Sequence, residues 1–285
     1  MKITFYGVRG SIPTPGIEYA RYGGNTACVH VELSDGTDIV LDAGTGIRIL
    51  GKSLLLKDTP IHVLLSHNHW DHIQGFPFFT PIFQPDREIV VVPGIVNDKN
   101  PTAVIDQMQG SLFPVHFEDL NANISINEID ESISEWPCGE ATVQRMPINH
   151  PGGGCAYSVM TENAKVVYLT DNEIYPPYKK SSDFLEFVEF CRNADLLIHD
   201  AQYTLSDMPA KSGWGHSVAE EAVKLAMASN TKQLALYSHD PERTDDDVDE
   251  IIAHCQTYIE ATHASLKLFA SAEGQSVNLD SKNTN

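Results

Sequence analysis

Six consecutive residues, His67-Asn68-His69-Trp70-Asp71-His72, bring three imidazoles and one carboxylate to one point of the chain. Imidazole and carboxylate are the side chains that proteins use to bind zinc and other first-row divalent metals. Four such groups cannot all be buried without partners, because each unpaired polar group costs free energy. The segment therefore predicts a metal-binding site.

More residues of the same types follow short runs of β-branched and aliphatic residues. These runs are typical of strands that are buried on both faces, and they cover 38–41, 61–65, 88–92, 165–169, 196–198 and 233–237. Asp42, Asp171, Asp200 and His239 each stand just after one of them, and His150 precedes a glycine-rich loop. In α/β proteins, sites form beyond the carboxyl ends of strands. We therefore expect these residues to gather around the six-residue motif.

Helical patterns separate the strands. Helices are expected over 183–194 and 247–264, and Asp245-Asp246-Asp247 would place carboxylates where the helix dipole favours them. Ser217-Val218-Ala219-Glu220 is the pattern of a capping box that opens a third helix. Strands that alternate with helices indicate a layered α/β protein.

Composition limits the class of protein. The 285 residues carry 19 Lys and Arg against 39 Asp and Glu, a net charge of −20, and 42% of them are hydrophobic. This acidity disfavours a protein that binds long nucleic acid, which requires clustered basic residues. Five scattered cysteines and the lack of a long apolar segment favour a cytoplasmic protein without a membrane anchor. No linker divides the chain, so we expect one domain over 1–280 and a polar tail over 281–285.

The order HxHxDH, an isolated His, an Asp after a strand and a late His resembles the pattern of the metallo-β-lactamase fold hydrolases. The resemblance implies an αββα sandwich of two mixed β-sheets flanked by helices. It also implies two divalent metal ions, Zn first, with Mn or Fe as alternatives. Carried over by position, the ligands are His67, His69 and His150 for one metal, Asp71, His72 and His239 for the second, and Asp171 as the bridge between them.

In this family the two metals generate a bridging hydroxide that attacks the substrate. The resemblance gives Asp71 the further role of orienting or deprotonating the attacking water. Asp42 and Asp200 would hold imidazoles in position. Both aspartates can equally be turn residues or helix caps.

Gly213-Trp214-Gly215-His216-Ser217 resembles the Gly-His-Ser motif of the phosphodiesterase branch, which includes the tRNA 3′-processing endonuclease and the cyclic-phosphate phosphodiesterases. His216 would then stabilise the phosphorane or protonate the leaving alkoxide. In the alternative interpretation it is only the residue before a helix.

Four further residues are candidates for contact with the substrate. Arg9 and Asn25 lie in two glycine-containing loops that also resemble those of the cyclic-phosphodiesterase-like members, although both loops can be plain tight turns. Phe76 and Phe78 follow the metal motif and could form a wall for a nucleobase. They could also be core residues that anchor the motif.

Gly46-Ile47-Arg48-Ile49-Leu50-Gly51-Lys52-Ser53 matches the Walker A phosphate-binding pattern. A phosphate-binding loop needs converging backbone amides and flexible residues. Here Ile47, Leu50 and Leu54 repeat at helical spacing, so we reject a nucleotide-binding module and expect a helix.

We therefore expect hydrolysis of a small phosphodiester such as a cyclic nucleotide or cyclic phosphate. A lactone, β-lactam or thioester hydrolase would use the same metals without requiring His216. A tRNA-processing nuclease is a third reading, although no basic arm is evident. The chain could form a homodimer. Residues 117–140 are expected to form either a pair of strands or a lid.

Overall fold

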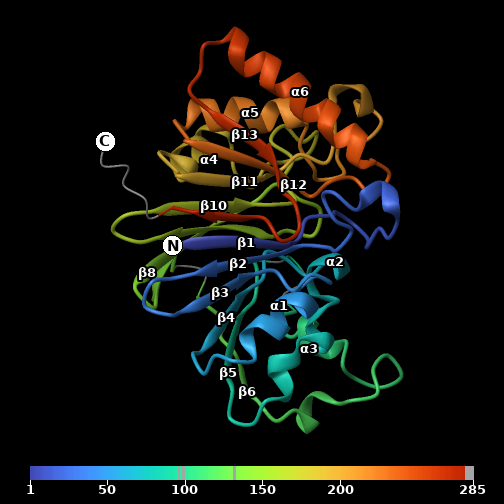
Figure 1. Ribbon diagram of the computed structural model, residues 1–285, viewed down its shortest axis with the longest axis vertical. Helices are drawn as coiled ribbons and strands as arrows, with labels where there is room; N and C mark the ends of the chain where they lie inside the picture. Colours follow the sequence, from blue (N-terminus) through green and yellow to red (C-terminus); the bar gives the residue numbers. More distant parts are fainter. Residues whose placement is uncertain (96, 98–99, 131–132, 280–285) are drawn as a thin grey trace.

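The computed structural model describes residues 1–279 except 96, 98–99 and 131–132. Two seven-stranded sheets pack face to face, and helices cover both outer faces (Figure 1). The expected αββα sandwich of two mixed sheets is therefore confirmed. The predicted tail over 281–285 lies outside the described residues.

The first sheet combines an antiparallel half with a parallel half. Strands β1 to β3 and β14 pair antiparallel, whereas β3 to β6 run parallel. In spatial order the strands are β14 (Ser276–Asn278), β1 (Lys2–Gly7), β2 (Cys28–Glu32), β3 (Asp38–Leu41), β4 (Ile61–Leu64), β5 (Glu88–Val92) and β6 (Asn123–Ile126). The helices on its outer face are α1 (Ile47–Leu54), α2 (Trp70–Ile73) and α3 (Ala103–Asp106).

The second sheet also combines a parallel half with an antiparallel half. Strands β10 to β13 run parallel, and β7 to β10 pair antiparallel. In spatial order they are β13 (Lys267–Ala270), β12 (Gln233–Tyr237), β11 (Leu196–Asp200), β10 (Lys165–Leu169), β9 (Cys155–Met160), β8 (Ala141–Pro147) and β7 (Glu135–Cys138). Its helices are α4 (Phe184–Cys191), α5 (Ala219–Ala228) and α6 (Asp245–Ala261). Short 3-10 turns occur at Ile17–Tyr19, Phe76–Phe78, Thr80–Phe83, Phe117–Asp119 and Leu205–Asp207.

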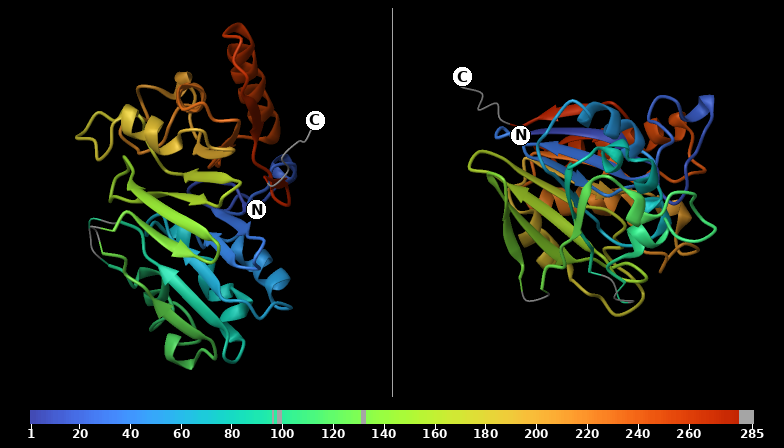
Figure 2. Two further views of the ribbon diagram at one scale, coloured as in Figure 1. Left: turned by 90° about the vertical axis from the view of Figure 1, so that its left-hand side faces the viewer. Right: turned by 90° about the horizontal axis from the view of Figure 1, so that it is seen from below.

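Three hydrophobic layers hold the sandwich together. Figure 2 shows the sheets and helices between which they lie. The central layer lies between the sheets and includes fully buried Phe5, Tyr157 and Tyr168. A second layer joins α4, α5 and α6 to the second sheet. A third joins α1 to the first sheet. Burial of this apolar area is the main favourable contribution to folding.

The helix at Ile47–Leu54 decides the Walker A question. Ile47, Leu50 and Leu54 point into the third hydrophobic layer, as their spacing predicts. Seven of the eight residues of the pattern therefore form a packed helix rather than a phosphate-binding loop, and the rejection of the nucleotide-binding reading agrees with the structure.

The start of α5 differs from the prediction. Its N-cap is Val218, and no side chain caps it. The hydroxyl of Ser217 instead donates a hydrogen bond to the carbonyl of Asn172 at 2.6 Å, so the predicted capping box is wrong. By contrast, α4 begins after Asp183 in a true capping box, and α6 begins at Asp245, two residues before the predicted start, in a box made by Thr244 and Asp247.

The segment 117–140 contributes one edge strand to each sheet. Strand β6 pairs with β5 in the first sheet, and β7 pairs with β8 in the second. The described part of this segment therefore contains two strands, in agreement with the first of the two expectations, a pair of strands or a lid. The two strands do not pair with each other. The segment carries the chain from one sheet to the other.

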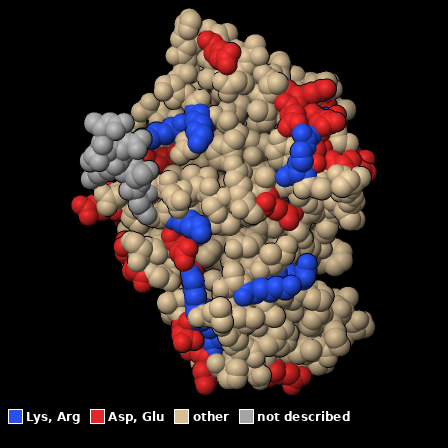
Figure 3. Space-filling model, viewed as in Figure 1, with Lys and Arg blue, Asp and Glu red and all other residues tan. Residues whose placement is uncertain are grey.

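Basic and acidic residues are interspersed on the face of the molecule that Figure 3 shows. On the face in Figure 3, basic side chains lie separately, and acidic side chains stand close to most of them. Among the helices of the described residues, none is long and apolar enough to cross a bilayer.

Candidate metal centre

The six-residue motif begins three residues beyond the end of β4 and continues into α2. His69 is the N-cap of this short helix, and Asp71 and His72 lie in its first turn. His67 and His72 are each only 1% exposed, whereas His69 is exposed. The motif therefore forms a buried cluster that reaches solvent at His69.

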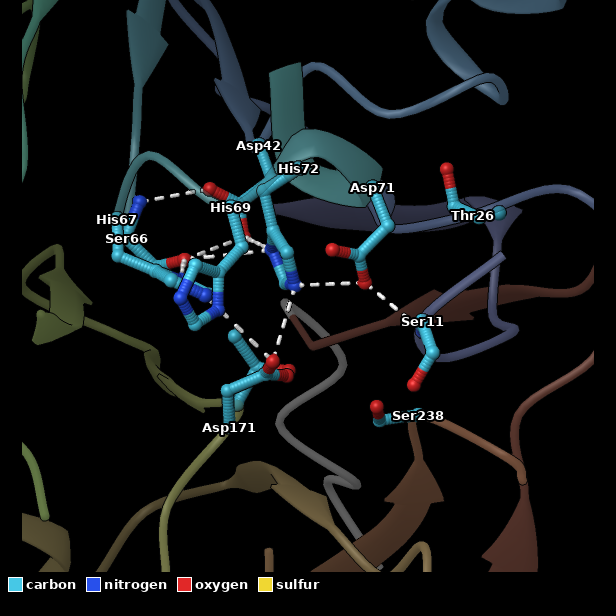
Figure 4. Close-up of polar contacts among 12 residues, drawn as sticks. Ser11, Thr26, Asp42, Ser66, His67, His69, Asp71, His72, Asp171 and Ser238 are labelled. Atoms are coloured by element: carbon cyan, nitrogen blue, oxygen red, sulfur yellow. Dashed lines mark hydrogen bonds and ion pairs between the residues drawn. The ribbon is translucent and has the colours of Figure 1, made fainter. Parts of the chain in front are cut away.

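The ends of the strands are unusual in their backbone geometry. Ser11, Asp42, Asp171 and Ser238 all have positive φ angles, between 46° and 64°, and Figure 4 shows them around the cluster. Non-glycine residues rarely adopt this region, and such strain persists where the surrounding structure enforces it. Strands of both sheets thus end in strained polar residues at one place, as expected for a functional site.

His67, His69, His150 and Asp171 form the first group of ligand atoms. One atom from each of these residues lies within 4.8 Å of all the others. His69 Nδ1 and His150 Nε2 are 3.0 Å apart, and His67 Nε2 is 3.6 Å from Asp171 Oδ2. The first sheet supplies the motif, and the second sheet supplies the other two residues. This is the set predicted for one metal.

Asp71, His72 and Asp171 form the second group (Figure 4). His72 Nε2 lies 3.2 Å from Asp71 Oδ2 and 3.2 Å from Asp171 Oδ2. Asp171 thus belongs to both groups, which is the position that a bridging carboxylate requires.

The donor set fits divalent metals. His67 Nε2 is buried and has no hydrogen-bond partner, although it faces Asp171, and an unsatisfied buried nitrogen costs free energy unless a ligand binds it. Burial and neighbouring imidazoles lower the pKa of His67, and burial also lowers the pKa of His69 and His150. These three imidazoles are therefore neutral at pH 7, the form that binds metal.

Around His72 the charge is unbalanced. Burial alone would lower the pKa of His72, but the carboxylates of Asp71, Asp171 and Asp42 outweigh it and raise that pKa well above its ordinary value. A single imidazolium then faces three buried carboxylates. Divalent cations would neutralise these carboxylates more completely.

Asp42 holds the motif in position through hydrogen bonds. Its Oδ2 accepts hydrogen bonds from His72 Nδ1 at 2.7 Å, the Ser66 hydroxyl at 2.8 Å and the Tyr168 hydroxyl at 2.8 Å. This leaves Nε2 of His72 directed at the second group, the arrangement typical of carboxylates that orient metal-binding imidazoles. Asp42 therefore makes the hydrogen bonds that this role requires, and the role itself stays a prediction.

His216 and Asp200 form a pair next to the metal ligands. Asp200 Oδ2 lies 2.6 Å from His216 Nδ1, and both residues lie within one 4.8 Å group with Asp171. Burial would lower the pKa of His216, but the Asp200 and Asp171 carboxylates raise it to about 9. His216 is therefore a proton donor at neutral pH in the metal-free protein.

His239 lies outside these groups of ligand atoms. Its Nε2 is 3.0 Å from the carbonyl oxygen of Ser271, and its ring packs edge-on against Tyr22. Burial lowers the pKa of His239 to about 4, so the ring is neutral. The structure thus does not bring His239 into the clusters with the other predicted ligands.

Residues 37–239 match the family model described as the β-lactamase superfamily domain. The chain belongs to this superfamily. Ribonuclease Z of Picrophilus torridus is 25% identical to it over 86% of the chain and 87% of its own length. Ribonuclease Z of Staphylococcus carnosus is 27% identical over 90% of the chain and 94% of its own length.

Solved structures of the superfamily share the fold. The metallo-β-lactamase fold protein YhfI from Bacillus subtilis has a TM-score of 0.69 at 18% identity and covers 97% of this chain and 99% of its own. The short form of human tRNase Z has a TM-score of 0.65 at 18% identity, covering 98% and 99%. A diphosphatase from the PhnP family has a TM-score of 0.67 at 17% identity, covering 97% and 97%. The chain is a metallo-β-lactamase fold hydrolase related to ribonuclease Z.

Two of the four residues expected to line the substrate, Arg9 and Phe76, are fully buried. Arg9 is fully buried, and its guanidinium donates to the carbonyls of Gly23 and Asp240, among others. Asn25 Nδ2 donates to Glu273 at 2.8 Å. Phe76 lies in the third hydrophobic layer. The expectations for Arg9 and Phe76 are wrong, because both side chains are fully buried. Asn25 is half-buried and Phe78 is exposed, and their contact with the substrate stays a prediction.

Sequence reasoning missed two groups at this superfamily site. The backbone N–H of Ser11 donates to Asp71 Oδ2 at 2.9 Å and so fixes the carboxylate. Glu173 is 3% exposed and accepts the N–H groups of Gly213 and Gly215, at 2.9–3.0 Å, which shapes the loop before His216. Only the spacing of Glu173 two residues after Asp171 could have drawn attention to it. A backbone donor leaves no mark on the sequence.

Proposed function

We propose that this chain is a metal-dependent phosphodiesterase that hydrolyses a small phosphodiester, such as a cyclic nucleotide or a cyclic phosphate. The observation that carries the proposal is the Asp200–His216 pair, which lies against the shared carboxylate Asp171. Hydrolysis of a carbonyl compound on the same scaffold would not require an acid at this position.

The chain offers ligands for two divalent ions. His67, His69 and His150 would hold one ion, Asp71 and His72 the other, and Asp171 both; Zn, Mn and Fe all accept this donor set. His239 stays our proposed further ligand of the second ion. When bound, the ions would supply an activated water and neutralise charge on the phosphoryl oxygens.

The proton chemistry falls to two side chains. Asp71, held by the Ser11 N–H, would orient the attacking water and accept its proton. His216, with Nδ1 held by Asp200, would use Nε2 to protonate the leaving alkoxide or to stabilise the charge of the phosphorane. Asp71 comes from α2 and His216 from the loop before α5, and they would act on the attacking water and on the leaving group, respectively.

Charge supports a small substrate. The net charge of −20 and the mixed surface of Figure 3 do not provide the broad basic surface that long polyanions need. Histidine ligands are neutral when they bind metal, so the loaded site would be locally positive within an acidic protein. Such a site attracts a compact anion.

Cleavage of tRNA precursors is the second candidate, because the similarity to proteins named ribonuclease Z extends over most of the chain. A substrate panel on Zn- and Mn-loaded protein separates the readings. It includes cyclic nucleotides, bis-nitrophenyl phosphate, a lactone, a β-lactam and a pre-tRNA. We expect turnover of the first two. Faster turnover of the lactone or β-lactam would overturn the proposal, and specific 3′ cleavage of pre-tRNA would favour the second candidate.

A further inference from the structure

Two exposed tryptophans stand next to residues of the metal centre. Trp70 is 72% exposed and lies between His69 and Asp71 in α2. Trp214 is 62% exposed and precedes His216 by two residues. A single exposed apolar side chain is ordinary. Two indoles that each adjoin a functional residue are a more specific observation.

The ring of His150 lies between the neighbours of the two tryptophans. His150 Nε2 is 3.0 Å from Nδ1 of His69, the neighbour of Trp70. On the other side of the same ring, His150 Nδ1 is 2.9 Å from the carbonyl oxygen of Gly215, the neighbour of Trp214. The residues next to the two tryptophans thus contact one imidazole from either side, near the exposed edge of the cluster at His69.

The loop that carries Trp214 is fixed in one shape. Gly213 and Gly215 have φ angles of 88° and 89°, and both donate to the buried carboxylate of Glu173. A Cβ atom at Gly215 would lie 2.2 Å from His150 Nδ1, so the chain passes too close for any other residue. The backbone on both sides of the exposed Trp214 is therefore fixed, which lowers the entropic cost of binding a ligand there.

We propose that Trp214 and Trp70 form a binding subsite for the nucleobase of a nucleoside phosphodiester whose phosphate lies at the metal centre. The inference rests on the proposed function and names the substrate class more narrowly. A base offers a flat π-face to an indole, and this stacking tolerates any base. The buried Phe76 cannot take this role. The acidic charge of the chain favours a single nucleotide over a long strand.

Two cyclic phosphates that differ in the base test the subsite. Adenosine 2′,3′-cyclic phosphate carries a base, and glycerol 1,2-cyclic phosphate has the same reacting ring without one. For Trp214→Ala we expect kcat/KM on the adenosine compound to fall about 5- to 150-fold, mainly through KM, which is the value of one stacked base. On the glycerol compound we expect the rate to stay unchanged. Trp214→Phe should restore most of the loss.

A matched control is Leu56→Ala, which removes an even more exposed apolar side chain beyond the end of α1 and should change neither rate. Equal losses on both substrates for Trp214→Ala would overturn the subsite and leave a structural role for the loop. An unchanged rate on the adenosine compound would also overturn it.

Binding separates the subsite from the proposed activity. If the wild-type protein cleaves neither cyclic phosphate, the proposed function fails, and titration of AMP against indole fluorescence still decides the subsite. The Trp70→Phe/Trp136→Phe variant keeps Trp214 as its one indole. Saturable quenching by AMP, and none by glycerol phosphate, supports the subsite. Absence of quenching contradicts it.

Discussion

The Nδ1 atom of His216 lies 2.6 Å from a carboxylate oxygen of Asp200, and both side chains are buried. The carboxylate comes from the end of β11, and the imidazole comes from the loop before α5. The contact fixes the ring and leaves its other nitrogen for a reacting group. It therefore gives the clearest test of the proposed chemistry.

Replacing His216 with Ala should slow cleavage of alkyl phosphodiesters by about 100- to 10,000-fold, the usual range for loss of a general acid. Nitrophenyl esters should be affected far less, because their leaving group needs little protonation. The measurement is kcat/KM for both ester classes on metal-loaded protein.

Asp200→Asn is the matched variant, since it keeps the shape of the side chain but removes the charge that holds His216. It should give a smaller loss with the same preference for alkyl esters. Equal losses on both ester classes for His216→Ala would contradict its role as an acid.

Removal of the metals should lower thermal stability. The ligands come from both sheets, so ions that bind only the folded state stabilise it by mass action, by about 2.7 kcal/mol at a hundredfold excess over Kd. Chelation should therefore lower Tm by several degrees. Differential scanning fluorimetry with and without EDTA, together with elemental analysis, measures both effects.

His67→Ala or Asp171→Asn should lose bound metal and the shift of Tm with EDTA. His254→Ala is the control, because this histidine is 65% exposed on α6 and pairs with Glu220 away from the ligand clusters. Full metal content in the Asp171→Asn variant would be incompatible with a shared bridging carboxylate.

Stability should fall in acid partly through Asp38. Burial raises the pKa of this carboxyl, but hydrogen bonds from His30 and Lys57 outweigh that effect and lower the pKa from 3.8 to about 2. A lowered folded-state pKa gives stability that is present above pH 3.8 and is lost as the pH falls towards 2. The full contribution is about 2 kcal/mol.

The difference in unfolding free energy between wild type and Asp38→Asn should therefore be larger at pH 6 than at pH 2.5. Urea titrations at both values measure it, and Asp58→Asn on the exposed loop before β4 is the control. A difference that does not change with pH would show that Asp38 acts by packing alone.

Phe76 and Phe78 should respond differently to truncation. Phe76 is fully buried in the layer beneath α1, so Phe76→Ala should cost about 3–5 kcal/mol of unfolding free energy. Phe78 is 56% exposed, so Phe78→Ala should cost less than about 1.5 kcal/mol. Chemical denaturation of both variants measures the two losses of unfolding free energy. Similar losses would contradict the burial of Phe76 and the exposure of Phe78.

The sequence predicted well those features that depend on local pattern. The runs at 88–92, 165–169 and 233–237 are strands with the same bounds, because continuous apolar runs leave few alternatives. The motif residues gather because the ends of parallel strands meet at one edge. The positions of His67, His150 and Asp171 follow from this topology.

Features that depend on distant partners were not predictable in the same way. Ser217 could have capped its helix, but the carbonyl of Asn172, 45 residues away, takes its hydroxyl. Phe76 and Phe78 are the same residue type two positions apart, and only packing against α1 buries one of them. Arg9 can be buried because backbone carbonyls more than two hundred residues away accept hydrogen bonds from its guanidinium.

The pairing of β1 with β14 has a consequence for synthesis on the ribosome. Lys2 of β1 pairs with Asn278 of β14, the edge strand of the first sheet. In the sequence, β14 comes after all the strands of the second sheet. While the nascent chain grows, the first sheet can form its other pairs but keeps an open edge at β1. Open edges invite pairing with other chains. The edge of β1 can therefore close only after every strand of the second sheet has been synthesised.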